Sequence, residues 1–392
     1  MANAEGDGNR ILDAAVELAP KIRASADEIE QGRRLPMHLV QEMKRAGLFR
    51  MAMPKAWDGP ELDFPTQLRV IETLSAADAS VGWCIMIGVD GGYMTAYIDQ
   101  TVAREMYQDL DSPTAITFSP PGKAVKMKDG FRVSGRWPFA SGCQHATWMI
   151  GHFALFDGDS PIVQPNGMPE TRFGFLPPQE CEIHDTWYTT GLRGSGSHHW
   201  SVQDRFIPEE RTLNLQKPTL YRDGPLYILP NFLIYKVVAV ALGIARGAID
   251  EFAALAAGKP ITFSTPGAKM LRDEAFAQSA IVRAEALVSS ARAFVFESIG
   301  DMWSTMVSGA LPSHKQRARG RLAMAHTNSA CTEAVELLYK ANGGASVYSR
   351  NAFDRRLRDI QTTNQHTVVS LKTWEVMGRV LLGLEPNYGL LF

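Results

Sequence analysis

The spacing of apolar residues changes twice along the chain, and this change limits the folds that the chain can adopt. From Ile11 to about Leu110 apolar residues recur at steps of three and four, which is the spacing of one buried helix face. From about Ser112 to Thr212 they alternate with polar residues, as in half-buried strands. From about Leu229 onward the helical spacing returns. The chain therefore runs from helices to strands and back to helices.

Local signals support each of these zones. The first zone includes a very apolar stretch from Trp83 to Ile98, which predicts one helix. In the middle zone, residues 125–133 alternate around Asp129-Gly130, a dipeptide that favours a hairpin turn. In the last zone, residues 267–311 contain no proline and predict one long helix, and a second is predicted from Arg321 to Ala341. The many alanines in both favour a close-packed bundle.

These observations predict an α+β fold of three domains. Residues 1–111 would form an N-terminal helical domain, residues 112–213 a central antiparallel β domain of barrel-like form, and residues 214–392 a C-terminal four-helix bundle. No internal repeat of the kind that a solenoid needs is present in the sequence.

Composition narrows the partners that are expected. The formal net charge of the 392 residues is −2, so neither nucleic acid nor an anionic membrane is indicated as a partner. The longest apolar run, Val237 to Ile244, is far shorter than a membrane span, and residues 1–10 show no apolar signal segment. The four cysteines are too widely separated for a zinc site or a redox pair, so no metal is predicted and a reduced, cytoplasmic protein is expected.

Several segments together resemble a known family. The most specific is a Gly-Arg-Trp entry into a Phe-x-Ser-Gly turn, at residues 135–142. The other segments lie at residues 46–50, 53–55, 191–197, 343–344, 358–359 and 365–366. With the order of the zones, they resemble the acyl-CoA dehydrogenase superfamily over essentially the whole chain. The branch that they resemble most is that of the flavin-dependent monooxygenases, which includes the oxygenase components of p-hydroxyphenylacetate hydroxylase and dibenzothiophene monooxygenase.

This resemblance implies an acyl-CoA dehydrogenase-like fold and the function of an oxygenase component in a two-component flavin-dependent monooxygenase. Such an enzyme uses reduced flavin, FAD or FMN, and O2 through a flavin hydroperoxide to hydroxylate or oxidise an electron-rich small molecule, such as an aromatic, an indole, an amine or a sulfide. The sequence shows no dinucleotide-binding fingerprint, so a separate NAD(P)H-dependent flavin reductase is expected as a partner. The resemblance also implies a homotetramer.

Two residues are predicted by resemblance to be catalytic. Ser141 would lie near the flavin N5 edge and help to retain the peroxide. His366 would hydrogen-bond or protonate the peroxy group, a task that suits an imidazole titrating near neutral pH. Each has a structural alternative, because a serine before a glycine commonly caps a turn and a single histidine is more often a core or surface residue.

The resemblance also predicts flavin contacts. The loop from Gly191 to Gly196 lacks the spacing of a Rossmann phosphate cradle and could equally be a simple β-turn loop. By resemblance, the cluster Arg355, Arg356 and Arg358 could meet a flavin phosphate across a subunit boundary, or it could form a solvated helix face. The predicted cofactor-binding residues are Trp137, Phe139, Ser141, Gly142, Arg193, Gly194, Ser195, Ser197, Gly343, Gly344 and Arg358.

A substrate pocket is expected between the β domain and the bundle. Asp90 is a candidate base or anchor, although an exposed or capping aspartate is an equal explanation. His198 and His199 are adjacent on a predicted strand and point to opposite faces, so together they do not suit one metal ion. The predicted substrate-binding residues are Trp83, Asp90, Tyr93, Ser119, Pro120 and His198.

Two other functions stay open. An acyl-CoA dehydrogenase or flavin oxidase needs a carboxylate base, but the stretch Thr363-Asn364-Gln365-His366 has no acid where many dehydrogenases carry one, so the base would have to lie elsewhere. A non-catalytic scaffold of the same fold would bind no flavin in either redox state.

Overall fold

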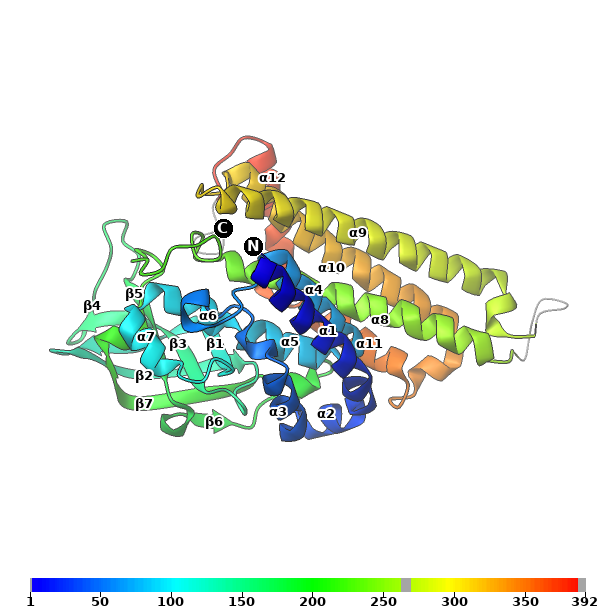
Figure 1. The fold of residues 1–392 in the computed structure, drawn as a ribbon, viewed down its shortest axis with the longest axis horizontal. Helices are drawn as coiled ribbons and strands as arrows, with labels where there is room; N and C mark the ends of the chain where they lie inside the picture. The colour runs from blue at the N-terminus through cyan, green and yellow to red at the C-terminus, as the bar shows by residue number, and fades with distance from the viewer. Residues whose placement is uncertain (1, 262–268, 387–392) are drawn as a thin grey trace.

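In the computed structural model the chain forms three layers that follow one another along the sequence (Figure 1). The structure describes residues 2–261 and 269–386, without the side chains of residues 2–7 and of Pro120. The N-terminal helices occupy the middle of the molecule, with the sheet on one side and the long helices of the bundle on the other (Figure 1). The predicted order of helices, strands and bundle is confirmed. The domain boundaries near residues 111 and 213 stay predictions.

Two helices of the N-terminal layer begin at an aspartate that caps them. The Asp63 carboxylate accepts the Thr66 amide at 2.8 Å, and the Asp78 carboxylate accepts the amides of Ser80 and Val81, which satisfies free N–H groups at two helix starts. The helices are α1 (Ala2–Ala24), α2 (Ala26–Gly32), α3 (Met37–Arg45), α4 (Phe64–Ala77), α5 (Ala79–Gly88), α6 (Asp90–Met94) and α7 (Gln100–Met106).

The single helix predicted from Trp83 to Ile98 is wrong. The chain is divided there into α5, α6 and the 3₁₀ turn η3 (Thr95–Tyr97). Gly91 and Gly92 weaken a continuous helix, and each packs so closely on a neighbour, Tyr107 or the Ala52 backbone, that no Cβ fits there.

The strands form one mixed sheet. They are β1 (Thr114–Lys126), β2 (Gly130–Ala140), β3 (Trp148–Asp157), β4 (Ser160–Pro161), β5 (Thr171–Leu176), β6 (Glu182–His184), β7 (His198–Pro208) and β8 (Thr212–Leu213). Their order is β6-β7-β2-β1-β3-β5-β8, with β4 paired to β3. The predicted hairpin is confirmed, because β1 and β2 pair antiparallel with Lys126 opposite Phe131.

One pairing differs from the purely antiparallel domain that was predicted: β1 and β3 run parallel, with Thr114 opposite Trp148. Because β2 ends beside the start of β1, residues 141–147 cross that end of the sheet, and β3 then starts on the other side of β1. This crossing segment begins with Ser141, so the topology places a predicted catalytic residue at the end of the sheet that faces the helices.

The C-terminal bundle contains both predicted long helices. Its helices are α8 (Val237–Gly258), α9 (Ala275–Val307), α10 (His314–Asn342), α11 (Ala352–Thr363) and α12 (Leu371–Leu381). Small residues such as Ala277, Ala284 and Ala291 form much of the fully buried face of α9, which allows close approach to α10. Phe276 lies outside this stripe and is exposed.

A long apolar helix lies inside the protein. The stretch Phe232–Gly258, which includes α8, is long and apolar enough to cross a membrane, with a mean hydropathy of 1.8 over 18 of its residues, yet 94% of those residues are buried. It packs against α4, α9 and α10. Its apolar character is therefore that of an interior helix of the fold.

Candidate active site

Trp83 on α5 joins the two residues that were predicted to be catalytic. Its Nε1 donates a hydrogen bond to Ser141 Oγ at 2.9 Å, and its ring meets the His366 imidazole edge to face with centroids 5.5 Å apart. Ser141 lies in the segment that crosses the end of the sheet, and His366 lies between α11 and the 3₁₀ turn η10 (Thr367–Val369). The sheet, the N-terminal layer and the bundle thus meet at one indole ring.

Ser141 also begins a chain of three hydroxyl groups. Its Oγ lies 2.7 Å from Ser197 Oγ, which lies 2.7 Å from Ser195 Oγ. All three side chains are buried. The carbonyl of Ser195 accepts the Gly142 amide at 2.9 Å and the Cys84 thiol at 3.6 Å, so the loop carrying two of the serines is fastened to the crossing segment and to α5. The three predicted serines are therefore adjacent.

His366 is a neutral imidazole in this site. Burial lowers its pKa to about 4, and the charge of Arg321 acts in the same direction. Its Nδ1 accepts the Val368 amide at 3.4 Å, so the ring proton resides on Nε2. The expectation that this imidazole titrates near neutral pH is wrong, because its surroundings disfavour the charged ring. His366 can act as a hydrogen-bond donor through Nε2 without changing its protonation state.

Two aromatic residues of the Gly-Arg-Trp-Pro-Phe motif have opposite environments. The Trp137 ring is fully buried, stacks on Trp200 at 4.4 Å and donates to the His152 carbonyl, so a flavin could reach it only by displacing core side chains. The Phe139 ring is 65% exposed and meets the edge of Trp187. The β2–β7 register shifts between Trp137 and Ala140, and Phe139 lies in this bulge with a φ of +63°.

The loop before β7 is fixed from the bundle side. Leu192, with a φ of +49°, donates its amide to the buried Asp359 carboxylate at 2.7 Å. Burial, followed by the nearby charge of Asp78, raises the pKa of Asp359 to about 7. Trp187 Nε1 donates to the Leu192 carbonyl at 3.0 Å. These contacts determine where Ser195 and Ser197 lie.

Trp187 was missed by the prediction, and Asp359 was part of the resembling segment at residues 358–359 but was not among the predicted site residues. Of the other predicted loop residues, Gly194 packs against Ile29 without room for a Cβ, and Arg193 lines a small cleft of about 240 Å³ beside α2. Arg193 and Gly194, two of the four residues of this loop that were predicted as flavin contacts, therefore lie against α2.

Arg358 and its neighbours on α11 form ion pairs within the chain. Arg358 pairs with Glu30 at 2.7 Å and with Asp354 at 2.8 Å, and it donates to the Thr190 carbonyl at 2.5 Å. A solvated helix face is wrong for this cluster, since Arg355 pairs with the acids of α2 and Arg356 with Glu251 of α8. The contact of the cluster with a flavin phosphate stays a prediction. Among the predicted cofactor residues, Gly343 and Gly344 lie on an exposed turn with open space beside them.

The predicted substrate residues do not form one cluster. Asp90 is neither exposed nor a cap, because it forms a buried ion pair with Lys236 of the turn before α8, whose ammonium group lies 4.5 Å from the centre of the Tyr93 ring. Tyr93 donates to Gln67 at 2.8 Å. Ser119 is exposed on β1, and the side chain of Pro120 lies outside the described part of the protein.

His198 has a structural explanation. It is buried, and its Nδ1 accepts the amides of Thr186 and Trp187, both at 3.2 Å. Burial lowers its pKa, so the ring is neutral and supports the loop that carries Trp187. Within residues 2–261 and 269–386, no group of three or more His, Cys, Asp or Glu side chains is arranged to hold a metal ion.

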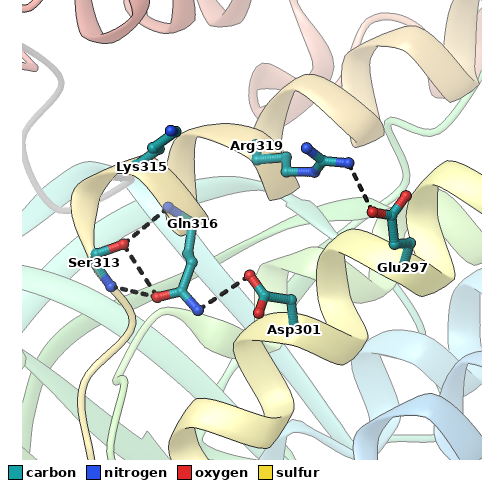
Figure 2. A pocket seen from close by; sticks show the side chains of 6 residues that line it. All are labelled: Glu297, Asp301, Ser313, Lys315, Gln316 and Arg319. Carbon is teal, nitrogen blue, oxygen red and sulfur yellow. Dashed lines mark hydrogen bonds and ion pairs between the residues drawn. The ribbon is translucent and has the colours of Figure 1, made fainter.

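A larger hollow of about 430 Å³ lies elsewhere, on the surface between α9 and α10 (Figure 2). Its polar side chains bond to one another: Arg319 pairs with Glu297 at 2.9 Å, and Gln316 donates to Asp301 at 3.1 Å (Figure 2). It contains no aromatic residue and no predicted site residue. Size alone therefore does not identify the active site of this protein.

Comparison with known proteins agrees with the fold. The family model of the acyl-CoA dehydrogenase N-terminal domain matches residues 9–113, and that of the acyl-CoA dehydrogenase C-terminal domain matches residues 235–371. The chain is 30% identical to indole-3-acetate monooxygenase of Pseudomonas putida, over 94% of this chain and 92% of that protein.

Two further similarities cover almost the whole length. The chain is 28% identical to the oxygenase subunit HsaA, a flavin-dependent monooxygenase of Rhodococcus jostii, over 91% of this chain and 92% of that protein. The crystal structure of XiaF from a Streptomyces species, in complex with FADH2 and glycerol, superposes with a TM-score of 0.87 at 23% identity, covering 99% of this chain and 98% of that one. The chain therefore belongs to the flavin-dependent monooxygenases of the acyl-CoA dehydrogenase superfamily.

Proposed function

We propose that this protein is the oxygenase component of a two-component monooxygenase that oxidises an electron-rich aromatic or indole compound at the site around Trp83. The observation that carries this proposal is the contact of one indole with both Ser141 and His366. This contact places two hydrogen-bond donors and an aromatic ring next to one another where the layers meet. A binding site that holds a small substrate beside a planar cofactor requires such a combination of polar and aromatic groups.

The residues present suit a flavin. Phe139 offers an exposed ring at the edge of the site, and Gly142, at a φ of +74°, keeps the adjoining turn free of a side chain. Ser141 offers a hydroxyl, and His366 offers its Nε2–H. When bound, a reduced flavin supplies the two electrons with which one oxygen atom of O2 enters the substrate and the other leaves as water. The relative crystallised with FADH2 supports testing FAD first and FMN second.

In this proposal the side chains of the protein assist the oxidation of the substrate as neutral groups. Ser141 and His366 can each donate a hydrogen bond to an atom that gains electron density, and neither has to lose its proton between pH 5 and 8. Trp83 keeps both in place, and the surrounding aromatic side chains limit the entry of water. These roles of Ser141 and His366 are the catalytic assignments that we propose.

The partners follow from the same proposal. A separate NAD(P)H-dependent reductase would supply the reduced flavin in the cytoplasm. We also propose a homotetramer, because α12 exposes an apolar stripe that suits a second copy of the chain: Leu371 is 87% exposed, and Trp374, Leu381 and Leu382 continue the stripe past the open Gly378. Sedimentation of the purified protein tests this assembly, and a monomer at micromolar concentration would contradict it.

The function is tested by mixing the protein anaerobically with reduced FAD or FMN and then adding O2 with candidate substrates, indole-3-acetate among them. We expect one oxygenated product for each reduced flavin consumed, with little hydrogen peroxide. If bound flavin is instead reduced by an acyl-CoA thioester, the protein is a dehydrogenase. If it binds flavin in neither redox state, the scaffold alternative is correct.

A further inference from the structure

Ser141, Ser197 and Ser195 form a chain of hydrogen-bonded hydroxyl groups, the serine chain, and counting its hydroxyl hydrogens shows which way the bonds run. Ser141 is 6% exposed, whereas Ser197 and Ser195 are 2% and 1% exposed. Ser141 Oγ is bonded to Trp83 and to Ser197, and Ser197 Oγ is bonded in turn to Ser195. Within the residues that the structure describes, these hydroxyls have no other hydrogen-bond partner. Ser141 is therefore the outer end of the chain.

Three hydroxyl hydrogens serve two hydroxyl–hydroxyl bonds, so one hydrogen is left over. It can remain on Ser195, on Ser197 or on Ser141, depending on the direction of the two bonds. On Ser195 or Ser197 it would be buried without an acceptor, which is unfavourable. On Ser141 it faces the site. The favoured direction therefore runs from Ser195 through Ser197 to Ser141.

In this direction both lone pairs of Ser141 Oγ are occupied, one by the Trp83 N–H and the other by the Ser197 O–H. The group that Ser141 can still offer is its own hydrogen. An oxygen that accepts two hydrogen bonds is also a stronger donor, because successive hydrogen bonds polarise one another.

We propose that Ser195 and Ser197 are positioning residues that hold Ser141 as a directed hydrogen-bond donor, so that the bound ligand must present an acceptor, such as a carbonyl oxygen or an unprotonated ring nitrogen, at this point. This inference rests on the proposed function, because the flavin is the ligand that it concerns. Ser197 acts through Ser141 and does not touch the ligand. Ser195 acts through Ser197.

A double-mutant cycle tests the inference. Affinities for FAD and FMN, oxidised and anaerobically reduced, would be measured by fluorescence titration for Ser197→Ala alone and in the background of Ser141→Ala. We expect Ser197→Ala to weaken binding of the preferred flavin about 5-fold when Ser141 is present, which corresponds to one hydrogen bond. In the background of Ser141→Ala the same change should have less than about a 2-fold effect.

Three further variants separate positioning from a general loss of structure. Ser197→Thr keeps the hydroxyl and should restore most of the affinity. Ser195→Ala should weaken binding by only about 2-fold, because it lies one bond further from the ligand. Ser201→Ala removes a serine of β7, which bonds to His184 at 2.7 Å and does not belong to the serine chain, and it should leave the affinity unchanged. Thermal denaturation establishes that each variant is folded.

The outcomes distinguish the inference from the function on which it rests. If the wild-type protein binds no flavin in either redox state, the proposed function fails and the inference fails with it. If the wild type binds flavin but Ser197→Ala has the same effect in both backgrounds, or no effect in a folded protein, the inference is overturned and the proposed function stands.

Discussion

The serine chain at Ser141 and the seam that α11 forms with α2 and α8 are both polar, yet they differ in charge. The seam consists of ion pairs, such as Arg358 with Glu30 and Arg356 with Glu251, in which every charged group has its partner inside the chain. The serine chain is neutral, and it ends in a hydroxyl that keeps a hydrogen for a ligand. The comparison teaches that the charged residues hold the layers together while the uncharged ones are available for chemistry.

The largest effect is expected from breaking the seam. Arg356→Ala removes a guanidinium that bonds to Glu251 and to the carbonyls of Ala76 and Ile244. Loss of one partner of a buried pair leaves the other uncompensated, so we expect a loss of about 3 kcal/mol in the free energy of unfolding. Urea denaturation measures it. The control is Arg350→Ala, an exposed arginine near the Tyr348 ring, for which we expect a change within about 0.5 kcal/mol.

Ser141→Ala tests the serine chain, the uncharged half of the comparison. It removes the donor that we place at the reacting atoms, so we expect the yield of oxygenated product per reduced flavin to fall about 100-fold. The free energy of unfolding should change by only about 1 kcal/mol, since one hydroxyl is lost. Product and hydrogen peroxide are measured together. If the variant unfolds readily but keeps its product yield, Ser141 is a structural residue, like those of the seam, and its catalytic assignment is wrong.

His366→Gln tests whether the His366 imidazole is uncharged in the folded protein near neutral pH. The folded His366 has a pKa of about 4, below the usual 6.5 for histidine, so acidification from pH 6.5 to 4 favours the unfolded chain, which takes up the proton more easily. The wild type should therefore lose more stability than His366→Gln over this interval. Between pH 6.5 and 8 the difference should be constant. Denaturation at several pH values checks it, and a difference that changes between pH 7 and 8 would indicate a titrating imidazole.

The smallest effect is expected at Asp359, where the seam meets the loop of the serines. Its pKa of about 7 lies above the usual value of 3.8, so the folded chain keeps this proton longer and a rise in pH from 4 to 7 favours unfolding. Asp359→Asn keeps an oxygen for the Leu192 amide and removes the charge. We expect its melting temperature to exceed that of the wild type by a few degrees at pH 8 and by less at pH 5. A lower melting temperature at pH 8 would mean that the negative charge stabilises the loop.

The sequence predicted features that depend on nearby residues. Asp129-Gly130 between β1 and β2 acts through contacts within a few residues, so the hairpin could be recognised. The parallel pairing of β1 with β3 could not, because it depends on a segment crossing the end of the sheet. The close packing of Gly91 and Gly92 on Tyr107 and Ala52, just after the helix is divided at Val89, likewise depends on residues distant in the sequence.

For the site, likewise, the sequence predicted individual residues but not how they are arranged in space. Ser141 and His366 were named from motifs, but their connection through Trp83 depends on three layers meeting. Burial, which lowers the pKa of His366, is likewise a property of the folded protein. Trp137 and Phe139 are two residues apart on β2, so simple alternation would place them on one face, whereas the bulge separates them.

The bulge at Phe139 has a consequence for how enzymes of this shape can change. A left-handed backbone at a non-glycine residue costs roughly 1 kcal/mol, and here it turns one ring out of the core while Trp137 remains packed inside. A substitution at position 139 can therefore alter the wall of the site without disturbing the tryptophan pair that supports the sheet. Substitutions at position 139, whether selected in nature or in the laboratory, can therefore change which substrates the proposed site accepts while the protein still folds.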